Sequence, residues 1–79
     1  MPKGLFNWKF SNVEKFLKEN YFVVTHTRGS HFYFLGQYGG EIRNVCVPFH
    51  GSKIIKIRTL KSIIFQSGIP KEKWIGNKK

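Results

Sequence analysis

The spacing of apolar residues near the start of the chain is that of an amphipathic helix. Val13, Phe16 and Leu17 recur at positions that share one face of a helix. Ser11 precedes them and Glu14 follows it by three positions, which is the spacing of a capping box. We therefore expect a helix that begins at residue 11 or 12 and ends near residue 20.

Three runs rich in β-branched and aromatic residues follow, and each predicts a strand. They span residues 22–27, 31–35 and 42–47. The turn Arg28-Gly29-Ser30 separates the first two runs, and the glycine-rich segment 36–40 separates the second from the third. Because these connections are short, the strands are expected to form an antiparallel meander that ends at Pro48.

A second amphipathic stripe lies near the end of the chain. Leu60, Ile63 and Ile64 share one helical face, so a helix should begin between residues 57 and 59 and end before Gly68. Pro70 is placed to open one more short turn that carries Trp74, and residues 77–79 are expected to fray.

These elements predict an α+β fold of order α-β-β-β-α. Two helices should cover one face of a three-stranded antiparallel sheet and leave the other face open. The 79 residues are too few for two cores, so one domain is expected over residues 1–79 with its core at about 10–75. Strand alternation divides the side chains between the two faces. The expected inward residues are Phe32, Phe34, Val45 and Val47, and the expected outward residues are His31 and Tyr33.

The charge of the chain indicates which kinds of partner it would attract. Fourteen Lys and Arg stand against four Glu and no Asp, which gives a net charge of +10. A surface of this kind attracts polyanions by neutralising phosphates and releasing counterions. Nucleic acid is the first candidate partner, an acidic protein the second and an anionic membrane the third.

The scarcity of acidic residues also limits the chemistry. Magnesium-dependent nucleases hold their metal with several carboxylates. Four scattered glutamates do not supply such a cluster, so no metal and no other cofactor is expected, and any nuclease activity should be metal-independent. The single cysteine, Cys46, excludes an internal disulfide and a multi-cysteine zinc site, and it is expected to be a small buried hydrophobe.

No apolar stretch approaches the length of a membrane span, and the N-terminus lacks the apolar region of a signal peptide. The expected protein is soluble and cytoplasmic, with no membrane partner.

Two of the three histidines stand beside turns at strand ends, where a side chain is accessible. They are His31 and His50, whereas His26 lies within a strand and is expected to be structural. Cleavage of RNA without metal needs a base for the 2′-hydroxyl, an acid for the leaving oxygen and cations for the phosphorane charge. Histidine serves as base or acid near neutral pH, and Lys and Arg supply the charge.

His31 is thus the candidate catalytic residue and His50 an auxiliary candidate. The candidate RNA-binding residues are Arg28, Ser30, Lys53, Lys56 and Arg58.

Each of these residues also has a purely structural interpretation. A strand histidine is more often a solvent-facing or structural residue than a catalyst. His50 between Pro48 and Gly51 is also placed to fix its loop, Ser30 to turn the chain, and the segment 53–58 to form a solvated charged edge. These alternatives stay open on the residue pattern alone.

Several short motifs follow one another along the chain. They are Gly29-Ser30-His31 with Phe34, then Val45-x-Val47-Pro48-x-His50-Gly51, then Lys56, Thr59-Leu60-Lys61-Ser62-Ile63-Ile64 and Gln66-x-Gly68. Their order and spacing resemble those of the HicA family of toxins, which are small mRNA interferases of type II toxin–antitoxin modules. The resemblance runs from about Ser11 to Trp74. Where the family commonly has glycine before the Phe that opens the first strand, this chain has Tyr21, and Phe65 replaces a usually polar residue.

Membership would imply a double-stranded-RNA-binding-domain-like fold, His31 as the catalytic residue, mRNA as the substrate and a HicB antitoxin that covers the site. The alternative function is a non-catalytic RNA-binding module of the same shape. A third is a basic protein that binds mainly an acidic partner.

Overall fold

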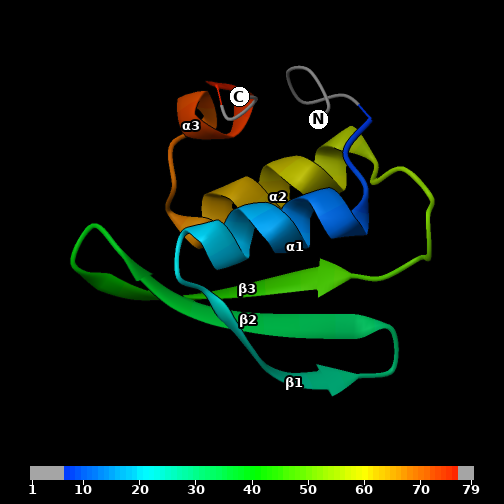
Figure 1. Ribbon diagram of the computed structural model, residues 1–79, viewed down its shortest axis with the longest axis horizontal. Coiled ribbons are helices and arrows are strands. Elements are labelled where there is room, and N and C mark those ends of the chain that lie inside the picture. Colours follow the sequence, from blue (N-terminus) through cyan, green and yellow to red (C-terminus); the bar gives the residue numbers. More distant parts are fainter. Residues whose placement is uncertain (1–6, 77–79) are drawn as a thin grey trace.

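The computed structural model describes residues 7–76, and the ribbon in Figure 1 shows their arrangement. In chain order the elements are α1 (Phe10–Glu19), β1 (Val23–Arg28), β2 (His31–Tyr38), β3 (Glu41–Pro48), α2 (Ile57–Ser67) and α3 (Lys71–Gly76). The sheet order is β1-β2-β3 with both pairings antiparallel, so the predicted meander is confirmed. The predicted fraying of 77–79 lies outside the described residues.

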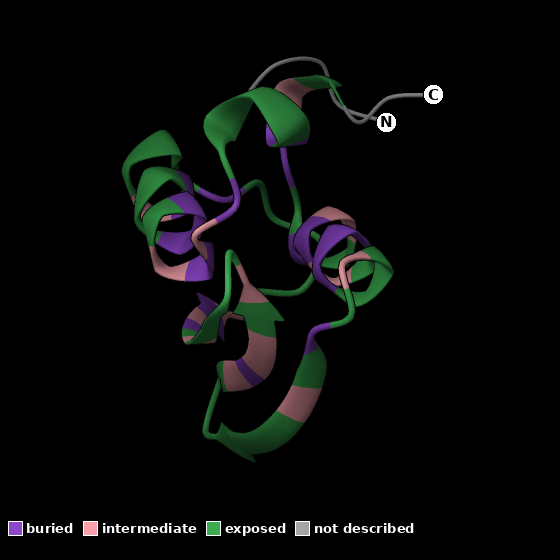
Figure 2. Ribbon diagram, turned by 90° about the vertical axis from the view of Figure 1, so that its left-hand side faces the viewer, coloured by how far each residue is buried: buried purple, intermediate pink, exposed green. Residues whose placement is uncertain are grey.

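The helices form a layer over one face of the sheet. α1 and α2 lie side by side against it, and α3 lies on the side of these helices away from the sheet (Figure 1). Figure 2 shows the buried residues gathered between the elements and the exposed ones on the outer surfaces. No helix in the described part of the chain is long and apolar enough to cross a membrane. The core consists of Trp8, Phe10, Val13, Phe16, Leu17, Phe22, Phe34, Val45, Val47, Ile55, Leu60, Ile63, Ile64, Ile69 and Trp74.

The predicted division of the strands into two faces is confirmed. Phe34, Val45 and Val47 are fully buried, and Phe32 packs against the same core. His31 is exposed and Tyr33 is half-buried on the face that no helix covers. Burial of the apolar set therefore presents His31 to solvent.

The start of α1 differs from the predicted capping box. Lys9 is the cap residue, and its backbone N–H donates to Oδ1 of Asn12 at 2.9 Å. Ser11 is already inside the helix, so the predicted pairing of Ser11 with Glu14 is wrong. The helix begins earlier because Phe10 is drawn into the core and Lys9 forms a β-bridge with Ile54.

The predicted turn at 36–40 is too long, because β2 continues to Tyr38. A β-carbon at Gly36 would overlap the ring of Phe22. Glycine at this position therefore allows the backbone of β2 to pass close to a core side chain. Only Gly39 and Gly40 turn the chain, with φ values of 67° and 82°. Two consecutive positive φ values are those of a type I′ hairpin turn, which matches the twist of the strands.

The prediction that Cys46 is a buried hydrophobe is also wrong. This residue is half-buried on the open face opposite Tyr33, because its neighbours Val45 and Val47 take the inward positions of β3. Its backbone N–H, on the outer edge of the sheet, donates to Oε1 of Gln66 at 3.0 Å. A side chain of α2 thereby occupies part of the free edge of β3.

Tyr21 adopts a conformation that is unusual for a residue with a β-carbon. It lies just past the end of α1 with a φ of 69°. Its N–H donates to the carbonyl of Lys18 at 3.0 Å, and that of Phe22 donates to Leu17 at 2.9 Å. This is the Schellman pattern, in which glycine normally fills the left-handed position. The Tyr21 side chain is 88% exposed, so packing does not offset the strain.

We expect Tyr21→Gly to stabilise the fold by about 1 kcal/mol, since a β-carbon in the left-handed region costs about that much. Tyr21→Ala is the matched control, because it removes the exposed ring but keeps the β-carbon. The free energy of unfolding from urea titration measures both. An equal gain from the alanine variant would show that the ring, and not the backbone, is unfavourable.

Candidate functional site

The candidate site lies where the β1–β2 turn meets the end of β3. His31 opens β2, with Arg28 directly across from it on β1 and Pro48 on β3. The backbone N–H of Phe49 donates to the carbonyl of Ser30 at 2.6 Å, so the pairing continues one step past the strand. The turn that precedes His31 is therefore held on both sides.

A cluster of three aromatic rings supports this end of the sheet from the helix side. The ring of Phe10 lies 4.8 Å from that of Phe32 and 5.0 Å from that of Phe49, and Phe32 and Phe49 are 5.7 Å apart, centre to centre. The three rings come from α1, β2 and the loop after β3. They fix the start of α1 against the strand that carries His31.

The loop between β3 and α2 is held by the segment that precedes α1. Ile55 donates its backbone N–H to the carbonyl of Trp8 at 2.7 Å, next to the bridge between Lys9 and Ile54. This loop and the start of α2 form a shallow hollow of about 380 Å³. The hollow is lined by Pro48, His50, Lys53, Ile54, Ile55, Lys56 and Thr59.

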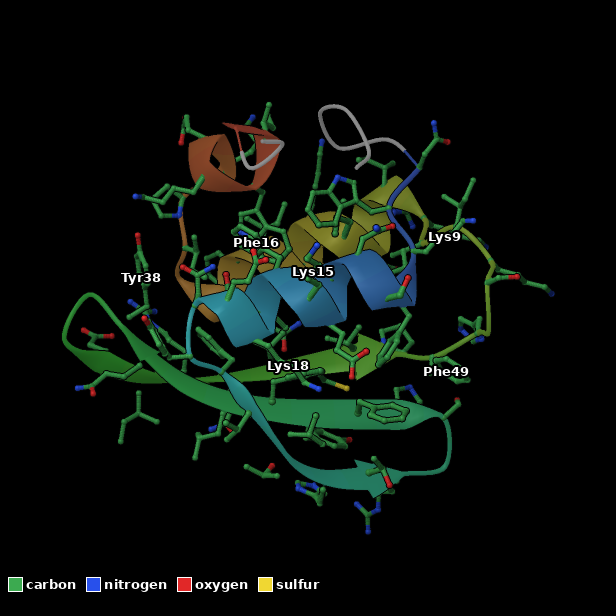
Figure 3. The ribbon with its side chains drawn as sticks, viewed as in Figure 1. Lys9, Lys15, Phe16, Lys18, Tyr38 and Phe49 are labelled. Carbon is green, nitrogen blue, oxygen red and sulfur yellow. The ribbon has the colours of Figure 1, made fainter. Side chains whose placement is uncertain are left out.

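Positive charge gathers at this end of the molecule. α1 and α2 both begin here, with no acidic residue in the first turn of either (Figure 1). Helix N-termini carry partial positive charge, which adds to that of the side chains. Figure 3 places both Lys9 and Phe49 at this end of the molecule. The exposed cations at the ends of these elements and in their connecting loops are Lys9, Arg28, Lys53, Lys56 and Arg58.

The acidic residues lie elsewhere. Glu14 pairs with Lys18 at 3.2 Å along α1, and Glu41 pairs with Arg43 at 3.5 Å at the opposite end of the sheet. Glu19 ends α1 and Glu72 lies on α3. In residues 7–76 no three His, Cys, Asp or Glu side chains gather in a group that would hold a metal ion.

The predicted site residues thus fall into two sets. Arg28 and Ser30 flank His31 at the edge of the open face. Lys53 and Lys56 line the hollow together with His50, and His31 is not part of that lining. Arg58 is exposed on the first turn of α2.

The residue pattern gave no sign of an irregularity in β1. The pairing with β2 shifts between Val24 and His26, so Thr25 is an extra residue in a β-bulge. Beyond the bulge, His26 stacks on Tyr33 with ring centres 4.4 Å apart and planes at 5°. Lys9 is likewise a cation of this end that the predicted set did not include.

A basic α-β-β-β-α protein with its helices on one face of a three-stranded antiparallel sheet has a double-stranded-RNA-binding-domain-like fold. A family model described as the HicA toxin of bacterial toxin–antitoxin systems matches residues 10–69. The chain therefore belongs to the HicA toxin family. Searches of curated proteins and of solved structures gave no match.

Replacing Lys53, Lys56 and Arg58 together with glutamine should weaken binding to a short RNA duplex and flatten its salt dependence. Three lost phosphate contacts would reduce the slope of log K against log salt by about two to three. Fluorescence anisotropy across a salt series measures the slope. The charge-matched control replaces Lys15, Lys18 and Lys71. If the control flattens the slope and the first variant does not, the phosphate contacts lie on α1 or α3 and not at the start of α2.

Proposed function

We propose that this protein is an mRNA-cleaving toxin, a metal-independent endoribonuclease in which His31 is the catalytic residue. The observation that carries the proposal is the placement of His31, which is exposed at the positive end of the sheet directly across from Arg28. Membership of the HicA toxin family supports the same assignment.

The proposed chemistry uses the RNA's own 2′-hydroxyl as the nucleophile. His31 removes its proton, and the 2′-oxygen attacks the adjacent phosphorus. Arg28 and the cations of the neighbouring loop stabilise the charge that develops on the phosphorane oxygens. The products are a 2′,3′-cyclic phosphate, which hydrolyses to a monophosphate, and a 5′-hydroxyl end.

The distribution of carboxylates supports a route without metal. Two-metal nucleases organise their ions with several convergent acidic side chains. Here Glu14 and Glu41 are ion-paired, and the other two glutamates lie at the end of α1 and on α3.

His31→Ala should abolish RNA cleavage and growth inhibition and leave the fold intact, because an exposed residue at a strand end contributes little packing. Purified protein with labelled RNA, and expression at matched levels without antitoxin, measure the two effects. A variant as toxic as the parent protein would refute the catalytic assignment. A parent protein that binds RNA but cleaves none would favour the non-catalytic RNA-binding module.

Cleavage should persist in EDTA, because no metal takes part in the proposed step. RNA with a 2′-deoxy or 2′-O-methyl sugar at the cut position should resist, since it lacks the nucleophile. Mass spectrometry of the fragments should find cyclic phosphate and 5′-hydroxyl ends. Activity that is lost in EDTA and restored by magnesium would exclude this mechanism.

The proposed partner is an acidic HicB-type antitoxin that binds over the face carrying His31, in the cytoplasm. A domain of net charge +10 attracts the RNA around it, and an oppositely charged partner is captured quickly.

Rising antitoxin should displace RNA from the His31→Ala variant, because the two ligands would share one surface. Using the inactive variant keeps the RNA whole during the titration. The measurement is the apparent RNA affinity at each antitoxin concentration. A ternary complex with unchanged RNA affinity would rule out occlusion, and inhibition would then have to work by displacing His31 or by blocking only the cleavage step.

A further inference from the structure

The bulge at Thr25 decides which face of the sheet His26 occupies. Side chains two apart on a regular strand share a face, so His26 would otherwise face the same way as Val24, which packs against the core. The extra residue reverses the alternation of side chains between the two faces. Beyond it, His26 pairs with Tyr33 and Arg28 pairs with His31. His26 is therefore exposed on the open face, the one that carries His31.

On that face His26 and His31 are diagonal neighbours. His26 lies opposite Tyr33, which is two positions along β2 from His31 on the same side of the sheet. Diagonal positions across an antiparallel pair are about 7–8 Å apart, within reach of aromatic side chains. Side chains at this spacing on one face can both reach a single phosphodiester.

Contacts with two neighbours hold the imidazole of His26 in place. The hydroxyl of Thr25 lies 3.1 Å from Nδ1 of His26 and 3.2 Å from the backbone carbonyl of Tyr33. A hydroxyl has one proton to donate, and the carbonyl oxygen only accepts. Both contacts are hydrogen bonds when Thr25 donates to Tyr33 and Nδ1–H of His26 donates to Thr25. Nε2 then remains the nitrogen that can exchange a proton with a ligand, and the Tyr33 ring covers one face of the imidazole.

We propose that His26 is a second catalytic residue, the general acid that protonates the leaving 5′-oxygen during RNA cleavage. The inference rests on the proposed function of His31 as the base. His31 takes the proton of the 2′-hydroxyl, and the bond from the 2′-oxygen to phosphorus forms as the bond to the 5′-oxygen breaks. The 5′-oxygen keeps the electron pair of that bond and takes the Nε2 proton of imidazolium His26. Proton exchange with water restores both side chains.

A comparison of two substrates can show whether His26 donates a proton or only supports the structure. One is a short RNA cut by the parent protein, and the other carries sulfur in place of the 5′-oxygen at the cut position. A thiolate leaves without protonation, so the second substrate does not need an acid. His26→Phe keeps an aromatic ring against Tyr33 and removes the donor. It should slow cleavage of ordinary RNA by about 100-fold or more and cleave the sulfur substrate nearly as fast as the parent protein.

His31→Ala is the reference for the base and should stay inactive on both substrates. Thr25→Val, which removes the hydroxyl that orients Nδ1, should lose activity on ordinary RNA and recover it on the sulfur substrate. Thr27→Val is its matched control on the same strand and should behave like the parent protein.

The outcomes separate this inference from the function on which it rests. Full activity of His26→Phe on ordinary RNA, or equal slowing on both substrates, would overturn the role of His26 and leave that of His31 in place. If His31→Ala regained activity on the sulfur substrate, His31 would be the acid and not the base, and the assignment of His26 as the acid would be overturned. An active His31→Ala on ordinary RNA would instead contradict the proposed function itself.

Discussion

Burial of one face of the sheet is the constraint on which the arrangement of this molecule depends. Phe34, Val45 and Val47 are fully buried beneath the helices, and strand alternation then directs the residues between them outward. His31 is exposed for this reason, and moving β2 by one residue would exchange its two faces. The core therefore specifies the orientation of the candidate base with far more free energy than any contact of the histidine itself.

The same packing also concentrates charge. α1, α2 and β2 all begin at the same end of the molecule, so the two helix N-termini and the loop before α2 lie at the end of the sheet that carries His31 (Figure 1). Two of the four acidic residues, Glu14 and Glu41, are already ion-paired with Lys18 and Arg43. A phosphate chain would thus meet positive potential at this end, whereas the opposite end of the sheet carries the neutralised pair of Glu41 and Arg43.

The order of elements, the two faces of the sheet and the position of His31 were predictable from the sequence, because apolar spacing and glycine turns report them directly. Gly36 was misassigned to a turn, since the overlap that requires it involves Phe22, fourteen positions away. The start of α1 depends on the bridge between Lys9 and Ile54, which is equally non-local. The bulge at Thr25 has no mark in composition or spacing, so the outward position of His26 followed only from the strand register.

The two tryptophans of the chain lie outside the segment that the family model covers, one before it and one after it. Their rings are 5.5 Å apart, centre to centre, and both also lie against Phe16. Nearly all indole emission should therefore come from one buried cluster on the side of α1 away from the sheet. Intrinsic fluorescence would report whether the two flanking segments are docked, and it would hardly respond to a ligand bound at His31. Folding could therefore be followed by tryptophan emission in the same sample in which ligand binding is followed by a different signal.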